Sequence, residues 1–173
     1  MPRRLPLRTE PQPGSLPATW AWRGEPAEPG RAVIVDVDGT LSDASGRQHF
    51  LDRPRKQWDA FFDAAGDDPV IAEVATLLRL LDHDLQVILL TARPVRVREL
   101  TLAWLALHEL RWDLLVMRPT RDYRSSPDAK RDAVSELKQH GFAIELAFDD
   151  DPRNVAMFHA EGIPCLYLHS GYY

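Results

Sequence analysis

From residue 31 onward, short apolar runs alternate with longer amphipathic segments, and this alternation constrains the fold more than any other feature of the sequence. The apolar runs predict strands over residues 31–36, 85–90, 112–117, 142–148 and 164–168. Between the runs, apolar residues recur every three or four positions, as in helices that pack one face on a core. Repeated strand–helix units favour a parallel sheet with helices on both faces. The sequence therefore predicts an α/β fold with a doubly wound, five-stranded parallel sheet.

Prolines mark the expected beginnings of the helices. Proline suits the first helical turn, because the amide hydrogen that it lacks has no partner there in any helix. Such prolines stand at four places: Pro69, Pro94, Pro127 and Pro152. We expect a helix after each of them, and the second of these should run for about four turns.

Residues 41–68 interrupt the alternation. They separate the first strand from its helix by far more than the usual connection of about two to six residues. They include Gly46-Arg47 and a helical piece around Trp58. A long segment after the first strand would lie over the carboxyl end of the sheet. We predict a small cap or lid there, and a surface loop without a role is the alternative.

Residues 1–30 differ from the rest of the chain. They are rich in proline and arginine and show little apolar periodicity, which predicts a flexible N-terminal arm before a folded domain over 31–173. Trp20 and Trp22 are exceptions that we expect to pack onto the domain. A basic arm could touch a phosphate backbone, but a disordered leader is the favoured interpretation.

The composition narrows the class of protein. At 173 residues the chain suits one α/β domain, and 45% hydrophobic with 27% charged residues is typical of a soluble globular protein. A net charge of -5 argues against a surface dominated by nucleic-acid binding, although a local basic groove remains compatible. The single cysteine, Cys165, excludes an internal disulfide framework. With no recognisable membrane span or secretory signal, we expect a cytoplasmic protein.

The predicted first strand ends in two carboxylates, Asp36 and Asp38, followed by Gly39 and Thr40. Side chains two residues apart in a strand point the same way, so the two acids can share one pocket. That pocket would lie beyond the carboxyl end of the strand, where open parallel sheets bind ligands. A capped strand followed by a glycine turn is the simpler alternative.

Polar residues also follow three other predicted strands. These residues are Thr91-Ala92-Arg93, then Arg118 in an Arg/Asp-rich loop over 118–125, and Asp149-Asp150-Asp151; Lys130 begins the helix after that loop. Each has a structural explanation of its own, such as a threonine cap, a solvated loop or an N-cap acid at Asp151. Their joint position at one edge of the sheet favours a functional site.

This set of side chains suits phosphoryl transfer through a carboxylate. An aspartate can attack phosphorus to form an aspartyl-phosphate, which splits hydrolysis into two easier steps. Packed carboxylates and a phosphate repel one another, so a hard divalent cation such as Mg²⁺ is required. Threonine, lysine and arginine can then bind the oxygens that gain charge in the transition state. A second aspartate can protonate the leaving oxygen and later activate water.

Four segments in order, Asp36-Val-Asp-Gly-Thr40, Thr91, Lys130 and Asp149-Asp150, resemble the four motifs of the haloacid dehalogenase (HAD) superfamily of phosphohydrolases. The resemblance implies a Rossmann-like core with Asp36 as nucleophile and Asp38 as general acid/base. It implies a Mg²⁺ site made of Asp36, the backbone carbonyl of Asp38 and the Asp149/Asp150 pair. Thr91 and Lys130 would bind the phosphoryl group, and Thr40 would contact the substrate.

The chain is more closely similar to the 3′-phosphatase domain of phage-type polynucleotide kinase-phosphatases. Arg47 lies eleven residues after Asp36, and Ala92-Arg93 follows the second motif, as in that subfamily. Asp122 precedes the motif lysine, and Ser170-Gly171 matches its C-terminal ending. The resemblance implies that Arg47, Arg93 and Asp122 bind substrate, with Arg118 or Arg124 along the route of the strand. No Gly-x-x-x-x-Gly-Lys-Ser/Thr motif occurs, so the chain has no kinase half.

These features favour a Mg²⁺-dependent phosphomonoesterase that removes 3′-phosphates from nucleic-acid ends during repair. The same chemistry on a small phosphorylated metabolite or a mononucleotide is an alternative, and so is transfer of the phosphoryl group to an alcohol. A further alternative is a catalytically silent HAD-like subunit that works beside a separate kinase or ligase. The filled catalytic positions disfavour that last interpretation.

Overall fold

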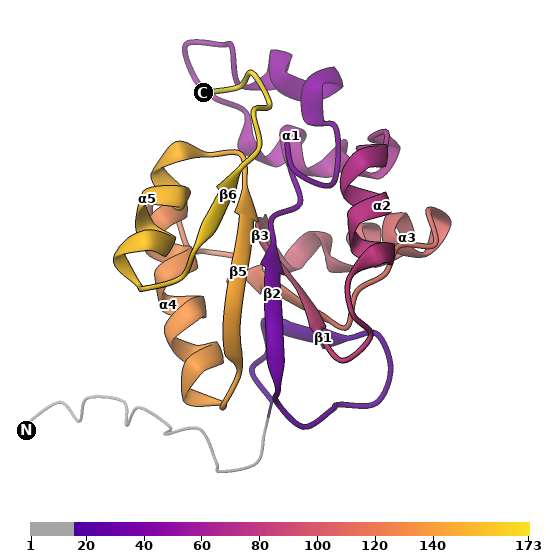
Figure 1. Cartoon of the computed structure of the whole chain (residues 1–173). Coiled ribbons are helices and arrows are strands. Elements are labelled where there is room, and N and C mark those ends of the chain that lie inside the picture. Colours follow the sequence, from indigo (N-terminus) through magenta and orange to yellow (C-terminus); the bar gives the residue numbers. More distant parts are fainter. Residues whose placement is uncertain (1–15) are drawn as a thin grey trace, which may run out of the picture.

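The computed structural model describes residues 16–173, which fold around one six-stranded sheet (Figure 1). Its strand order is β1-β4-β3-β2-β5-β6. The strands are β1 (Trp20–Trp22), β2 (Arg31–Val35), β3 (Gln86–Pro94), β4 (Leu114–Arg118), β5 (Ala143–Asp149) and β6 (Cys165–Tyr167). The helices are α1 (Trp58–Asp63), α2 (Ala72–Leu80), α3 (Arg98–Leu107), α4 (Ser126–Gln139) and α5 (Pro152–Ala160). Short 3₁₀ helices are η1 (Ala44–Phe50), η2 (Ala65–Asp67) and η3 (Val95–Val97).

Strand periodicity divides the core into two halves, one on each face of the sheet. In β2, Val33 and Val35 pack in the cluster that contains residues of α2 and α3, while Ala32 and Ile34 pack in the cluster that contains residues of α4 and α5. Figure 1 shows α4 and α5 on one side of the sheet and α2 and α3 on the other. The predicted doubly wound α/β architecture is therefore confirmed, and β2 lies between β3 and β5 in the sheet.

The sheet has one strand more than predicted, because β1 pairs antiparallel with β4. Trp20 is buried, and its ring lies 5.9 Å from the ring of Phe142 between centroids. Burial of this large side chain draws residues 20–22 onto the sheet edge, so the arm predicted over residues 1–30 overlaps the sheet there. The other part of that predicted arm, residues 1–15, lies outside the described residues.

Strand β3 continues past the predicted strand end at residue 90 and carries an irregularity that shapes the site. Pairing with β4 passes from Leu90–Val116 directly to Pro94–Arg118, so residues 91–93 bulge out of the ladder. Pro94, predicted to begin a helix, is instead the last residue of β3, and η3 separates it from α3. The bulge matters because it contains both Thr91 and Arg93.

The insertion over residues 41–68 lies beyond the carboxyl end of β2, beside the C-terminal segment (Figure 1). It contains η1, α1 and η2, and Leu41, Phe61 and Phe62 bury their side chains in the main core. The segment is thus packed onto the domain instead of extending as an open loop. Among the described residues, no helix is both long and apolar enough to cross a membrane.

We expect Trp20→Ala to lower the free energy of unfolding by about 3–5 kcal/mol, because the substitution leaves a cavity between β1 and Phe142. Urea denaturation followed by circular dichroism measures the loss. Trp58→Ala is the matched control, since Trp58 is 48% exposed, and it should cost clearly less. Equal losses in the two variants would contradict the assignment of β1 to the core.

Candidate active site

Asp36, the predicted nucleophile, follows β2 and shares a buried lysine with Asp149 at the end of β5. Lys130 lies on α4, and its Nζ donates hydrogen bonds to Asp36 Oδ1 and Asp149 Oδ2, both at 2.6 Å. Burial by itself lowers the pKa of Lys130, but the two carboxylates outweigh it and raise that pKa above its ordinary value. Burial raises the pKa of Asp36 well above its ordinary value, and the neighbouring carboxylates add to this effect while Lys130 opposes it. One lysine thus serves two buried acids.

Three carboxylates at this edge can hold a cation together. Asp36, Asp149 and Asp150 each offer an oxygen, and these oxygens lie within 4.8 Å of one another. Asp150 Oδ2 is buried and has no hydrogen-bond partner among residues 16–173. Burial raises the pKa of Asp150 to about 7. An unpartnered carboxylate oxygen beside two others is the kind of donor set that hard divalent cations such as Mg²⁺ bind.

Gly39 allows the loop after β2 to lie against Asp150. Its φ is +89°, and a Cβ at this position would stand 2.0 Å from Asp150 Oδ2 and 2.6 Å from Asp150 Cγ. Both the positive φ and the missing side chain therefore require glycine. The glycine of the first motif brings the two strand ends together at the candidate cation site.

Asp38, the predicted proton-transfer residue, is held by two buried arginines. Arg93 donates to its carboxylate from Nε at 3.0 Å and from Nη2 at 2.7 Å, and Arg47 Nη2 donates to Asp38 Oδ1. Burial alone would raise the pKa of Asp38, but the charges of Arg93 and then Arg47 outweigh it and hold that pKa well below its usual range. These contacts fix the orientation of Asp38 and favour its charged form.

From the sequence we expected Arg47 and Arg93 to line a route for the substrate, but the structure places both side chains in the interior. Arg47 is 2% exposed and Arg93 is 0% exposed. Arg93 also donates to Thr101 Oγ1, and its guanidinium lies over the ring of Trp104. The Cζ atom of Arg47 lies 4.1 Å from the centroid of the Phe61 ring. Their donors are directed inward because buried guanidinium groups require acceptors. Because both arginines donate to Asp38, they affect the site through the orientation and charge of that carboxylate.

Asp68, a residue that the sequence analysis missed, joins the two arginines. Its Oδ2 accepts from Arg47 Nη2 at 2.6 Å and from Ser42 Oγ at 2.6 Å, and it lies 3.6 Å from Arg93 Nη2. The indole nitrogen of Trp104 donates to its backbone carbonyl at 2.8 Å. The only sequence signal for such a role was an acid just before the apolar stripe of α2, a position that an N-cap also explains.

The two predicted threonines lie in different surroundings. Thr91 Oγ1 accepts a hydrogen bond from the Arg93 amide at 3.1 Å, and Thr91 and Lys130 both line a cavity of about 280 Å³ between the ends of β3 and β4 and helix α4. Thr40 is fully buried, and its Oγ1 has no hydrogen-bond partner among the residues that the structure describes. Thr91 therefore borders an open space together with Lys130, which binds Asp36 and Asp149, whereas Thr40 is buried in the turn after β2.

Arg118, Asp122 and Arg124 line the same cavity as Thr91 and Lys130. Asp122 accepts hydrogen bonds from Arg124, and these lower the pKa of Asp122 to about 2. Arg124 also donates to Asp132 at 2.6 Å. The structure thus brings the three residues of loop 118–125 to the site, but two of them are paired with each other.

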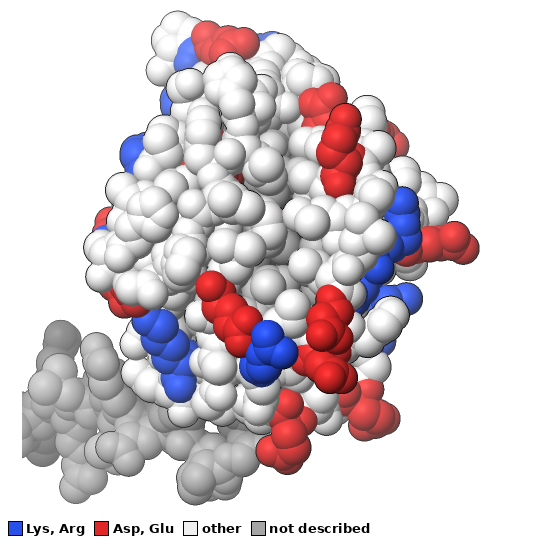
Figure 2. All heavy atoms as spheres, viewed as in Figure 1, with Lys and Arg blue, Asp and Glu red and all other residues white. Residues whose placement is uncertain are grey.

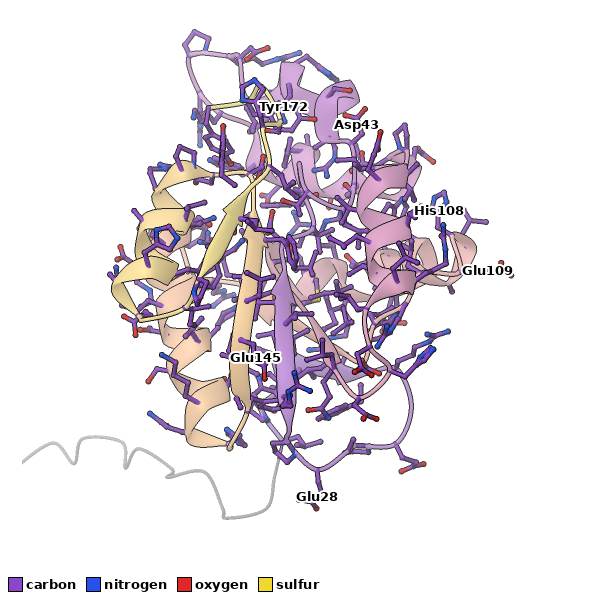
Figure 3. The ribbon with its side chains drawn as sticks, in the orientation of Figure 1. Glu28, Asp43, His108, Glu109, Glu145 and Tyr172 are labelled. Carbon is purple, nitrogen blue, oxygen red and sulfur yellow. The ribbon has the colours of Figure 1, made fainter. Side chains whose placement is uncertain are left out.

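The C-terminal segment closes one side of the site. Tyr172 Oη donates to Asp43 Oδ1 at 2.9 Å, and Figure 3 shows the two residues beyond the end of the sheet, one on the C-terminal segment and one on the insertion. Asp43 in turn caps η1, the helix that carries Arg47. A Cβ on Gly39 would lie 3.1 Å from Tyr172 Cε2. The C-terminal segment is therefore tied to the part of the insertion that positions Asp38.

The fold places Asp36 after β2, Thr91 in the bulge of β3, Asp149 at the end of β5 and Lys130 on α4, which are the positions expected for the motifs of a HAD-type phosphatase. A class C acid phosphatase from Bacillus anthracis, solved with tungstate bound, shares the fold at 15% identity and a TM-score of 0.55, over 85% of this chain and 69% of that one. A HAD-superfamily hydrolase from Geobacter sulfurreducens also shares the fold, at 15% identity and a TM-score of 0.53. That match covers 79% of this chain and 86% of the other.

The chain belongs to the polynucleotide kinase PNKP phosphatase domain family, which it matches over residues 30–173. It is also similar to a chain in the Pnkp1/Rnl/Hen1 RNA repair complex, at 30% identity and a TM-score of 0.70. That match covers 86% of this chain but 45% of the other, so this chain spans about half the length of that relative.

Asp68→Ala should lower the free energy of unfolding by about 3–5 kcal/mol, because it leaves Arg47 buried with one carboxylate fewer. Chemical denaturation measures the change. Asp63→Ala is the matched control: Asp63 pairs with Arg96 at the surface, where such a pair contributes about 0–1 kcal/mol. A loss at Asp68 no larger than that at Asp63 would refute the importance of the buried pairing.

Proposed function

We propose that this domain is a Mg²⁺-dependent phosphomonoesterase that removes 3′-phosphates from nucleic-acid ends through an aspartyl-phosphate. The observation that carries the proposal is the buried set of Asp36, Lys130 and Asp149, next to an Asp38 carboxylate oriented by two arginines. Membership of the PNKP phosphatase family supports the substrate. The similar chain in an RNA repair complex supports a role in end repair.

In the first step, a carboxylate oxygen of Asp36 attacks phosphorus and the P–O bond to the leaving alcohol breaks. The leaving oxygen takes a proton from Asp38, which gives a free 3′-hydroxyl and a phosphorylated Asp36. Free Asp38 is charged because Arg93 and Arg47 lower its pKa. A bound phosphate anion next to Asp38 opposes this effect and raises the pKa, so that the proton arrives with the substrate.

In the second step, Asp38 accepts a proton from a water molecule, and the resulting hydroxide attacks phosphorus. The bond between phosphorus and Asp36 breaks, which releases inorganic phosphate and restores the carboxylate. Here the two arginines help, because they stabilise the charged Asp38 that acts as base. Lys130 and Thr91 donate to the phosphoryl oxygens, where charge spreads in the transition state. Lys130 also keeps Asp36 in place between steps.

Asp36, Asp149 and Asp150, with the backbone carbonyl of Asp38, are the proposed Mg²⁺ ligands. A Mg²⁺ ion bound there offsets the negative charge of the carboxylates and the phosphate. The unpartnered Asp150 Oδ2 is the observation that supports this choice of ligands. We further propose that residues 31–173 form the catalytic domain, that the insertion over 41–68 covers the site, and that a separate kinase or ligase works with it in the cytoplasm.

Asp36→Asn should abolish hydrolysis of a 3′-phosphorylated oligonucleotide, because the amide cannot form the aspartyl-phosphate. The measurement is phosphate release from that oligonucleotide, from its 5′-phosphorylated counterpart, and from nucleotides and sugar phosphates. EDTA should remove the activity and added Mg²⁺ should restore it. Activity that survives in Asp36→Asn would overturn the mechanism, whereas a preference for mononucleotides or sugar phosphates would overturn only the polynucleotide substrate.

Asp38→Asn should lower kcat/KM for the 3′-phosphorylated oligonucleotide by about 10²–10⁴-fold, the usual contribution of a general acid. The loss should be much smaller for p-nitrophenyl phosphate, whose leaving group departs without a proton. Because kcat/KM reports the steps up to loss of the alcohol, comparison of the two substrates isolates the first step. Equal losses on both substrates would contradict the role of Asp38 as the acid.

A further inference from the structure

The loop over residues 119–125, between β4 and α4, forms the outer wall of the cavity that Thr91 and Lys130 line. A second, shallower hollow is lined by Pro119, Arg121, Asp122, Tyr123 and Arg124. The cavity and the hollow are adjacent, because Pro119, Asp122 and Arg124 line both of them. The proposed phosphoryl-binding donors Thr91 and Lys130 therefore line a cavity that adjoins a surface hollow on this loop.

The size of the cavity limits what it can hold. Its volume of about 280 Å³ is near the lower end of small-ligand pockets, which begin at about 300 Å³. It can accept one nucleoside unit next to a terminal phosphate. Any further nucleotide of a strand must then lie outside the cavity, over the hollow.

Two arginines can bind phosphate here, Arg118 at the end of β4 and Arg121 on the loop. Arg124 is paired with Asp122 and Asp132. Arg118 donates to the backbone carbonyl of Ser125, and its Nε is buried without a partner. Within residues 16–173, neither Arg118 nor exposed Arg121 forms an ion pair with a carboxylate. The charge of Arg124 offsets the nearby acids, which leaves Arg118 and Arg121 as local positive charge.

Tyr123 adds an aromatic surface to this positive charge. It is 91% exposed, the highest value among the large hydrophobic side chains of the described residues. A single exposed aromatic residue is common on proteins and proves nothing alone. Here it lies in the hollow with Arg121, next to a cavity that reaches Lys130. Aromatic rings beside arginines are the usual binding elements for single-stranded nucleic acid.

We propose that Tyr123, Arg121 and Arg118 form a strand-binding subsite for the nucleotide that precedes the phosphorylated end. The terminal nucleoside occupies the cavity, the preceding base stacks on Tyr123, and the phosphodiester between them lies against Arg118 and Arg121. This inference rests on the proposed 3′-phosphatase function and adds the part of the surface that distinguishes a strand from a small phosphate ester.

The distribution of charge over the rest of the molecule favours a short contact with one nucleotide over an extended strand-binding groove. On the face shown in Figure 2, the described acidic and basic side chains are interspersed and form no broad basic patch. The chain has a net charge of -5. Glu136 on α4 also lines the cavity, and its charge disfavours a second phosphate there. A short contact with stacking and one phosphodiester fits this distribution better than a long electrostatic groove.

The test compares a 3′-phosphorylated oligonucleotide with p-nitrophenyl phosphate in the full chain. Stacking of one base contributes about 1–3 kcal/mol, so Tyr123→Ala should lower kcat/KM for the oligonucleotide by about 5- to 150-fold. Activity on p-nitrophenyl phosphate should stay within about twofold, which also shows that the variant is folded. Tyr123→Phe keeps the ring and should retain activity on both substrates.

Arg121→Ala provides a second, independent readout. It removes one phosphate contact, so the slope of log(kcat/KM) against log salt should become less steep by about 0.7 for the oligonucleotide. Unchanged oligonucleotide activity in both variants, or equal losses on the two substrates, would overturn the subsite and leave the 3′-phosphatase proposal standing. A wild-type protein that hydrolyses p-nitrophenyl phosphate but not the oligonucleotide would overturn both proposals.

Discussion

The charge balance among buried side chains at the carboxyl end of the sheet is the constraint on which the rest of the site depends. Five carboxylates meet there, those of Asp36, Asp38, Asp68, Asp149 and Asp150, and all but Asp38 are buried. Three cations face them: Lys130, Arg47 and Arg93. The carboxylates outnumber the cations by two, and Asp150 Oδ2 has no hydrogen-bond partner among the described residues. A divalent cation bound there would supply positive charge to this acidic cluster, which is the physical reason to propose one.

The cations divide the site into two halves with different origins. Lys130, on α4, binds Asp36 and Asp149, so the proposed nucleophile depends on the sheet and the helices that cover it. Arg47, on η1, binds Asp38 and Asp68, so the proposed proton-transfer residue depends on the insertion as well. The insertion is therefore part of the proposed active site. Tyr172 and Asp43 extend this dependence to the C-terminal segment.

The site residues that lie at strand ends could be predicted from the sequence. The contribution of Asp68 in the insertion and the extra strand at the sheet edge could not. The polar residues of the central strands follow buried apolar runs, and parallel strands must end together, so Asp36, Thr91 and Asp149 could be placed beforehand. Asp68 could not, because its partner Arg47 lies 21 residues away on a short 3₁₀ helix that shows no sequence period. Strand β1 was missed because three residues are too short to show a period, and only the burial of Trp20 explains its place.

The same charge balance determines where substrate specificity can arise. Lys130, Arg47 and Arg93 direct donors to internal carboxylates, so in the proposed mechanism this cluster acts on the phosphoryl group and does not contact the rest of the substrate. Discrimination between a nucleic-acid end and a small ester must then come from groups outside the cluster. Within the described part of the cavity and hollow, the arginines without a carboxylate partner are Arg118 at the end of β4 and Arg121 on the following loop, which also carries Tyr123. In the proposed arrangement, the buried carboxylates carry the chemistry and the surface residues 118–125 carry the substrate choice, so substitutions in these surface residues would change specificity without disturbing the buried cluster.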